Sequence, residues 1–205
     1  MIYTIVKTIS YILFRIFWKI EITGSDNIPK KGSLIVASNH VSYFDPVIVG
    51  ASMKRKVHFI AKKEVFNTVL GNLFFRQLNA FPVDRDKVDM NALKNALNIL
   101  QQGEILGIFP EGTRSMDGEL KEFKLGIIKI AIKTGAPILP VGIIGVHKIY
   151  PRGNKFPTLF KHKIIVHFGS PICFSTQKIK DKIYQKESLN ELSQKIKELI
   201  QKDFN

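Results

Sequence analysis

Cysteine is almost absent from this chain. The single residue, Cys173, cannot form a disulfide within the chain. No cysteine and histidine cluster has the spacing of a zinc site, and the five histidines are spread out rather than grouped as metal ligands. A reducing compartment is the simple inference from so little cysteine. The sequence also lacks internal repeats and low-complexity tracts, which excludes repeat architectures.

Acidic residues are scarce as well. The 205 residues include 17 Asp and Glu but 31 Lys and Arg, for a formal net charge of +14. Between Phe123 and Lys180 there are ten basic residues and no acidic one. Such a stretch predicts an anionic partner, which is a nucleic acid, an anionic bilayer or an anionic substrate. The alternative is a soluble protein that is merely basic.

No long uncharged hydrophobic run is present either. Met1 to Ile20 is mostly apolar, but Lys7, Arg15 and Lys19 interrupt it, which disfavours a membrane span. The segment has no small-residue cleavage site, so we do not interpret it as a removed signal peptide. On a helical wheel the three basic residues share one sector with Tyr11 and Trp18. Aliphatic residues cover the other side: Ile5, Ile9, Ile12, Leu13, Ile16 and Ile20.

This pattern predicts an amphipathic helix that lies in the membrane interface, with Tyr11 and Trp18 at the edge of its apolar face. An amphipathic helix packed on the protein's own core is the alternative. The polar, turn-rich stretch from Gly24 to Gly32 follows the helix. We therefore predict a membrane-associated helix over residues 1–22 and one further domain over residues 23–205.

Beyond this stretch, short apolar runs alternate with helical patterns. Strands are predicted over Leu34–Ser38, Val57–Ala61, Ala80–Val83, Ile105–Phe109, Ile138–Ile144 and Lys163–Phe168. Helices are predicted over Pro46–Met53, Glu64–Gln77, Val88–Gln102 and Phe123–Lys133, with one or two surface helices in Lys178–Lys202. The alternation indicates an α/β sandwich around a largely buried sheet.

The first candidate site, residues 39–46, follows the predicted strand Leu34–Ser38. His40 and Asp45 are five residues apart, so they would not share a face of one helix. They meet if His40 lies in the loop and Asp45 begins the helix, which Pro46 favours because proline suits the first turn. Asp45 would then orient the imidazole, and His40 would take a proton from an attacking hydroxyl. The alternative is an ordinary Asp helix cap beside a polar loop.

A second polar segment follows the predicted strand Ile105–Phe109. Gly112 lets the backbone approach a ligand, while Thr113, Arg114 and Ser115 supply hydrogen-bond donors. Arginine matches phosphate with two parallel hydrogen bonds. Glu111 is placed either to contact a ligand hydroxyl or to hold Arg114. A solvated turn is the alternative.

Two further segments carry less chemistry. Phe81–Arg85 offers a second guanidinium after a predicted strand, although Asp84 and Arg85 also suit a surface ion pair. Ala136–Gly142 contains two prolines in an apolar run, which indicates an edge or irregular strand. It carries no reactive group, so at most it shapes an apolar wall. No G-x-S-x-G elbow occurs, which argues against a serine hydrolase.

Taken in order, these segments resemble the motifs of the glycerolipid acyltransferase family, specifically the 1-acyl-glycerol-3-phosphate acyltransferases. The resemblance covers about residues 20 to 172. The first motif is His40-x4-Asp45 with Asn39 before it. The others are Phe81–Arg85, Phe109–Ser115 and Ala136–Val141, with Phe123–Gly126 as the basic stretch after the third.

The resemblance implies an αβα sandwich with a mixed sheet and an N-terminal membrane anchor. It also implies acyl transfer from acyl-CoA or acyl carrier protein to the sn-2 hydroxyl of lysophosphatidic acid, without a metal or cofactor. His40 and Asp45 would be catalytic, and Arg85, Arg114 and Lys124 would hold the phosphate with Glu111, Gly112, Thr113 and Ser115 around the glycerol. The enzyme would act peripherally or monotopically at the cytoplasmic face of the cell membrane.

Two alternatives remain at this level. The acceptor is another lysophospholipid or glycerol-3-phosphate, or the chain is a non-catalytic basic protein that binds membranes. A nucleic-acid partner is not expected, because no recognisable binding motif accompanies the charge.

Overall fold

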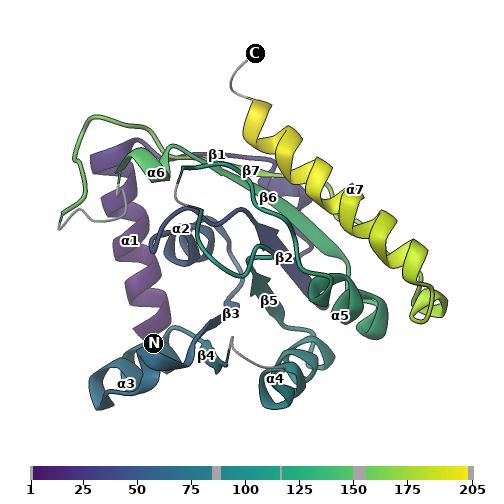
Figure 1. The fold of residues 1–205 in the computed structure, drawn as a ribbon. Helices are drawn as coiled ribbons and strands as arrows, with labels where there is room; N and C mark the ends of the chain where they lie inside the picture. The colour runs from purple at the N-terminus through teal and green to yellow at the C-terminus, as the bar shows by residue number, and fades with distance from the viewer. Residues whose placement is uncertain (1, 85–88, 116, 150–155, 203–205) are drawn as a thin grey trace.

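The computed structural model describes residues 2–84, 89–115, 117–149 and 156–202 (Figure 1). These residues build one mixed sheet of seven strands in the order β1-β7-β6-β2-β5-β3-β4. All neighbours are parallel except β6 and β7. The strands are β1 (Glu21–Thr23), β2 (Leu34–Ser38), β3 (Val57–Lys62), β4 (Ala80–Val83), β5 (Ile105–Ile108), β6 (Ile138–Ile144) and β7 (Ile165–Phe168).

Helices cover both faces of the sheet. They are α1 (Ile2–Trp18), α2 (Asp45–Ser52), α3 (Val69–Gln77), α4 (Met90–Gln101), α5 (Gly126–Thr134), α6 (Val146–Ile149) and α7 (Lys182–Gln201). In Figure 1, α1 and α2 lie on one side of the sheet and α5 and α7 on the other. The predicted αβα sandwich with a mixed sheet is confirmed.

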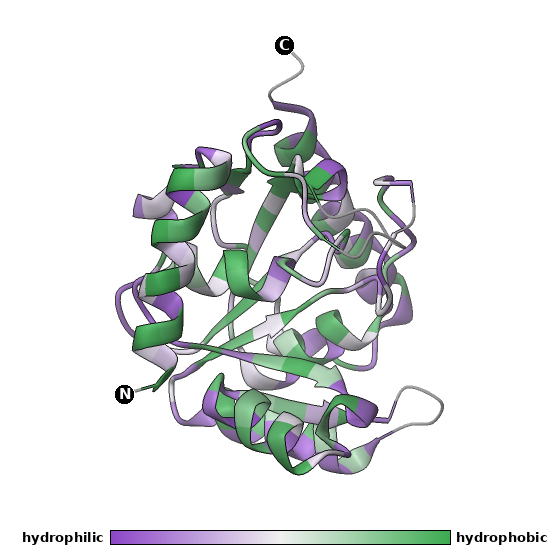
Figure 2. Cartoon of the chain, turned by 90° about the vertical axis from the view of Figure 1, so that its left-hand side faces the viewer, coloured by the Kyte–Doolittle hydropathy of each residue, from purple (hydrophilic) through white to green (hydrophobic). Residues whose placement is uncertain are grey.

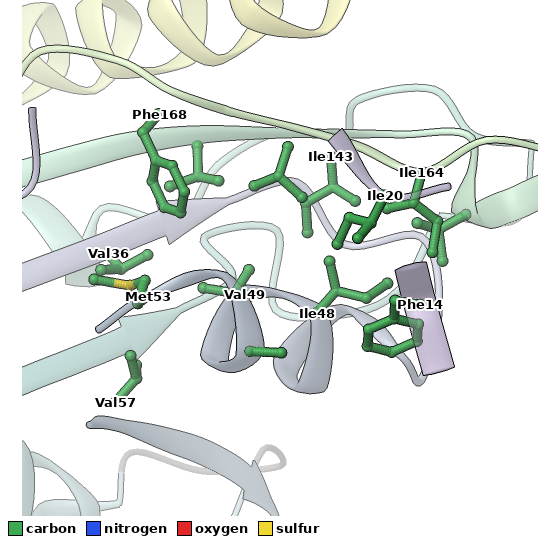
Figure 3. Close-up of a cluster of buried hydrophobic side chains, with 14 of the residues drawn as sticks. Phe14, Ile20, Val36, Ile48, Val49, Met53, Val57, Ile143, Ile164 and Phe168 are labelled. Carbon is green, nitrogen blue, oxygen red and sulfur yellow. The ribbon is translucent and has the colours of Figure 1, made fainter. Parts of the chain in front are cut away.

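The central strand β2 explains why the core divides into two layers. All five of its residues are buried, as expected for a strand covered on both faces. Leu34 and Val36 pack against α1 and α2, whereas Ile35 and Ala37 pack against α4, α5 and α7. Figure 3 shows the first layer, where Phe14 of α1 and Ile48 of α2 lie beneath the sheet.

Most predicted elements agree with the structure to within a few residues. The predicted helix Glu64–Gln77 is instead divided into a 3₁₀ turn, η2 (Lys63–Phe66), and α3. The break occurs because the Thr68 hydroxyl caps α3 and accepts a hydrogen bond from the Gly71 N–H at 3.0 Å. Four short elements were not predicted from the sequence: β1, α6 and the 3₁₀ turns η1 (Ser25–Asn27) and η3 (Thr176–Lys178).

The predicted edge or irregular strand is β6, which contains Pro140 and begins just after Pro137, and it does not lie at an edge. It runs between β2 and β7. The ladder with the following segment pairs Val141 with Phe168 and Ile138 with Ile172, so one strand has an extra residue between the pairs. The extra residue is in the segment that follows β7, between Phe168 and Ile172, and Pro140 lies opposite it, where proline's missing N–H is tolerated.

Helix α1 both packs on the core and exposes an apolar stripe. Phe14 and Trp18 are buried, and the Trp18 indole donates to the Thr158 carbonyl at 2.7 Å. The prediction that Trp18 lies at the membrane edge is therefore wrong, because tertiary packing captures it. The predicted boundary between residues 22 and 23 falls inside β1, which pairs with β7.

The opposite side of α1 remains solvent-exposed along its length: Ile2, Ile5, Ile9, Ile12, Leu13 and Ile16. Figure 2 shows hydrophobic residues along this helix as it rises from the N-terminus. Among the described residues, no helix combines the length and apolar character needed to cross a bilayer.

Candidate active site

The candidate site lies where parallel strands β2 and β5 end side by side. Because the two strands are parallel neighbours, the loops that follow Ser38 and Ile108 emerge at the same edge of the sheet. Asn39, the residue after β2, is held in place by the neighbouring strand β6. Its buried side chain donates to the Ile143 carbonyl at 2.9 Å and accepts from the Ile143 N–H at 2.8 Å. This pair of hydrogen bonds to β6 fixes the start of the His40 loop.

His40 and Asp45 meet as the sequence predicted. The imidazole Nδ1 lies 2.7 Å from Asp45 Oδ2, with His40 in the loop and Asp45 as the first residue of α2. The same oxygen accepts the N–H groups of Val41 and Ser42, each at 2.7 Å. The alternative of an ordinary Asp helix cap is not what the structure shows: Phe44 is the N-cap residue of α2, and the Asp45 carboxylate folds back onto the loop without a capping hydrogen bond among the described residues.

The surroundings of Asp45 determine how the pair is protonated. Asp45 is fully buried. Burial raises the pKa of Asp45, while the hydrogen bonds from His40, Ser42 and Val41 lower it. Within the described residues its Oδ1 has no hydrogen-bond partner, so a proton there would be a buried donor without an acceptor. The geometry favours a carboxylate that accepts from Nδ1–H and leaves Nε2 of His40 to accept a proton.

His40 lines a cleft that is otherwise mostly apolar. The cleft has a volume of about 450 Å³ and includes Gly112 and Lys124. Apolar residues from the surrounding strands and α5 complete much of its wall: Ile60, Val83, Ile108, Ile127 and Ile130. The imidazole stacks on the Phe109 ring with centroids 4.1 Å apart. A molecule in this cleft would therefore lie beside the His40 imidazole and apolar walls.

Glu111 joins the two loops of the site. Its Oε1 accepts the His40 N–H at 2.7 Å, and its Oε2 accepts the Lys121 N–H at 3.1 Å. The Ser115 N–H donates to the His40 carbonyl at 2.8 Å, which adds a second link. Burial raises the pKa of Glu111 from 4.5 to about 7, although hydrogen bonds to the N–H groups of His40 and Lys121 oppose the shift. Contact between Glu111 and a glycerol hydroxyl stays a prediction.

Of the other predicted binding residues, Gly112 and Lys124 line the cleft, whereas Arg114 does not. Gly112 has a φ of 73°, and a β-carbon there would lie 2.9 Å from the Lys124 side chain. Glycine therefore allows Lys124 to cross the loop into the cleft. The Arg114 guanidinium lies over the exposed Tyr43 ring at 3.4 Å from its centroid. Arg85 lies outside the described residues.

Thr113 and Ser115 occupy different environments. Thr113 is exposed, whereas Ser115 is buried. The Ser115 hydroxyl donates to Asp117 at 2.7 Å and accepts the Gly118 N–H at 3.0 Å. These contacts stabilise the turn after the motif, and binding of a substrate by either residue stays a prediction.

Three residues that shape the site had no role predicted from the sequence. Phe109 supports the imidazole, Tyr43 lies under Arg114, and Lys121 bonds both Glu111 and the Arg114 carbonyl. Phe109 and Tyr43 lie within the motifs, so a role at the site could have been predicted from their positions. Lys121 stands outside the motifs, and nothing local distinguishes it from other lysines in the chain.

The fold and site define a class of protein, and comparison with known proteins agrees with it. The family model described as Acyltransferase matches residues 19–144, so this chain belongs to the acyltransferase family. The resemblance identified from the four motifs is thereby confirmed.

Particular relatives point to one branch of that family. The chain is 33% identical over 151 residues to a 1-acyl-sn-glycerol-3-phosphate acyltransferase of Borreliella burgdorferi, covering 73% of this chain and 60% of the relative. It is 31% identical to the Bacillus subtilis enzyme of the same name, covering 75% of this chain and 73% of the relative. The chain thus spans less than two thirds of the Borreliella relative.

A solved structure resembles nearly the whole chain. The crystal structure of the 1-acyl-sn-glycerophosphate acyltransferase PlsC from Thermotoga maritima matches with a TM-score of 0.78 and 30% sequence identity. The match covers 97% of this chain and 79% of the other. The similarity therefore extends through α1 and α7 as well as the central sheet.

Proposed function

We propose that this protein transfers a fatty acyl chain from acyl-CoA or acyl carrier protein to the sn-2 hydroxyl of 1-acyl-glycerol-3-phosphate. The product is phosphatidic acid, a precursor in phospholipid biosynthesis. The names of the Borreliella, Bacillus and Thermotoga relatives support this acceptor. The single observation that carries the proposal is the 2.7 Å pair between His40 and fully buried Asp45 beside an apolar cleft.

In the proposed reaction, Nε2 of His40 removes the proton from the acceptor hydroxyl as its oxygen attacks the thioester carbonyl. Asp45 holds the ring through Nδ1 and stabilises the imidazolium that forms. When the tetrahedral intermediate collapses, the carbon–sulfur bond breaks and the departing thiolate takes the proton from His40. The products are the ester and a free thiol. No metal or cofactor is expected, so EDTA is expected to leave the rate unchanged.

Basic side chains are proposed to hold the acceptor phosphate. Lys124 lines the cleft beside Gly112, and the Arg114 guanidinium lies over Tyr43 in the loop between His40 and Asp45. Arg85, which follows β4 in the sequence, is proposed to contribute a second guanidinium. Because guanidinium groups match phosphate with paired hydrogen bonds, Arg114 and Arg85 suit this role.

The proposed reaction takes place at a membrane surface, because both the acceptor and the product carry insoluble chains. We propose that α1 attaches the protein peripherally or monotopically to the cytoplasmic face of the cell membrane. Its exposed aliphatic stripe and the exposed basic residues Arg15 and Lys19 support this attachment.

The test is release of free thiol from acyl-CoA or acyl carrier protein in the presence of detergent-dispersed lysophosphatidic acid. His40→Ala is expected to lower turnover about a hundredfold to ten-thousandfold, the usual worth of general-base assistance. His58→Ala is the matched control, because His58 lines a separate pocket that contains none of the site residues. Near-normal turnover in folded His40→Ala protein would end the mechanism.

The same assay run over a panel of acceptors tests the finer assignment. Transfer to lysophosphatidic acid is expected to exceed transfer to other lysophospholipids and to glycerol-3-phosphate. A preference for one of those acceptors would keep the chemistry and change the substrate. Absence of transfer to any acceptor, with retained vesicle binding, would favour a membrane-binding protein without activity.

A further inference from the structure

Helix α3 exposes a large apolar surface that the proposed reaction does not use. Its apolar face consists of Val69, Leu70, Leu73 and Phe74, which are 85%, 81%, 58% and 50% exposed. The opposite side of the same helix faces inward, where Phe75 and Leu78 line an apolar pocket. Four large apolar side chains together on one short helix are more than the scattered exposure of an ordinary soluble surface.

The apolar face of α3 continues onto α1. Ile2, near the start of α1, lines the same open groove as Leu70, Leu73 and Phe74. Figure 1 shows α3 beside the N-terminal end of α1. The exposed stripe of α1 begins at Ile2 and runs the length of that helix. The two helices therefore present one continuous apolar surface rather than two separate patches.

The charges near this surface select an anionic bilayer as its occupant. Neither α1 nor α3 contains Asp or Glu, and Arg76 is the charged residue of α3. Exposed basic residues accompany the two helices and the start of β3: Arg15, Lys19, Lys54, Lys56 and Arg76. A second copy of this chain, also at +14, would bring cations against cations. Anionic headgroups beside a hydrocarbon layer match both features.

The pocket behind the two helices connects this surface with the catalytic loop. It has a volume of about 120 Å³ and is lined by Tyr3 and Val6 of α1, by Phe75 of α3 and by Leu78, the residue after α3. Tyr43, in the loop between His40 and Asp45, also lines it. A surface docked through both helices would therefore lie next to the loop that carries the proposed catalytic pair.

We propose that α3 is a second membrane-docking element, whose apolar face inserts with the stripe of α1 into the interface of an anionic bilayer. This adds to the attachment proposed for α1 and rests on it. It predicts that two separate helices, far apart in the sequence, contribute apolar area to binding. Basic residues around them supply the dependence on anionic lipid.

The test uses the full chain and vesicles of phosphatidylcholine with phosphatidylglycerol, without acyl donor. The double change Leu70→Gln and Leu73→Gln leaves α1 intact and is expected to lower the vesicle partition coefficient about tenfold or more. Ile183→Gln on α7 is the matched control, because Ile183 is an aliphatic residue of similar exposure, 73%. The control is expected to change the partition coefficient less than about twofold.

A second measurement does not depend on loss of binding. Phe74→Trp places a fluorophore on the apolar face of α3, and brominated lipids are expected to quench it strongly. Ile183→Trp is expected to remain unquenched, and the buried native Trp18 supplies the background. Quenching of Phe74→Trp together with weaker binding of the double variant supports the proposal.

Other results overturn the proposal. Unchanged vesicle binding by the double variant, with no quenching at position 74, removes α3 from the membrane contact. If light scattering shows a dimer that the double change dissociates without affecting vesicle binding, the face joins two copies. If the wild type does not bind vesicles, the α1 and α3 attachments both fail. Thiol release by the wild type in detergent is measured separately, so failure of the proposed acyl transfer remains distinguishable.

Discussion

Replacing Asp45 by asparagine separates the charge of the catalytic pair from its geometry. Three donors converge on Oδ2, from His40, Val41 and Ser42, each at 2.7 Å. An amide nitrogen at that position would face those donors, so the asparagine must place its carbonyl oxygen there. Its NH₂ group then occupies the position of Oδ1, which has no partner among the described residues. The imidazole should keep its orientation, and only the negative charge of its partner at position 45 is lost.

The magnitude follows from the distance between the charges. A full charge about 4 Å from the imidazolium contributes about 4 kcal/mol at an effective dielectric constant of about 20. Turnover should therefore fall about a thousandfold. We expect this loss to be no greater than that caused by His40→Ala. The Michaelis constant for the acceptor should change little, because Asp45 does not line the cleft.

Thermal unfolding separates this effect from loss of the fold. Asp45→Asn should destabilise the protein by about 1–3 kcal/mol, because its NH₂ group is buried without an acceptor while removal of the buried charge offsets the weaker hydrogen bonds. Asp45→Ala leaves the N–H groups of Val41 and Ser42 without their acceptor, at about 1–3 kcal/mol each. Turnover of Asp45→Asn within threefold of the wild type, measured by thiol release on folded protein, would refute the charge-stabilisation argument.

Three further changes test other parts of the molecule. Glu111→Gln should flatten the pH dependence of stability. The pKa of Glu111 is raised from 4.5 to about 7. Its contribution to the free energy of unfolding is therefore fully present below pH 4.5 and is lost as the pH rises through about 7. Thermal melts of both proteins between pH 4 and 8 check this, and parallel curves would contradict it. Arg114→Ala should raise the Michaelis constant for lysophosphatidic acid about tenfold to a hundredfold, the worth of a charge-assisted contact. A rise confined to the thioester constant would move Arg114 to the donor site. Arg15→Gln with Lys19→Gln should weaken binding to anionic vesicles about thirtyfold at low salt, at about 1 kcal/mol for each charge, and should leave binding to neutral vesicles unaffected. Equal loss on both vesicle types in co-sedimentation would show that electrostatic attraction is not the cause.

The sequence by itself determined the features that depend on neighbouring residues. Uninterrupted apolar runs such as Leu34–Ser38 defined the strands, since burial on both faces requires them. The spacing of His40, Asp45 and Pro46 was enough to predict a loop histidine meeting an aspartate at a helix start. Irregularity at Pro140 was also predictable, because proline lacks the N–H that a regular ladder needs.

Only the tertiary structure decided which distant groups meet. Glu111 reaches the His40 N–H because β2 and β5 are parallel neighbours, and no local pattern encodes that pairing. The same holds for the stacking of Phe109 on His40. The same holds for helix α1, whose periodicity was compatible with either a membrane or the protein core as its partner. In the folded chain Phe14 and Trp18 are buried in the core, whereas the aliphatic stripe from Ile2 to Ile16 is exposed. Periodicity shows that a helix has an apolar side, whereas the partner of that side depends on the rest of the folded chain.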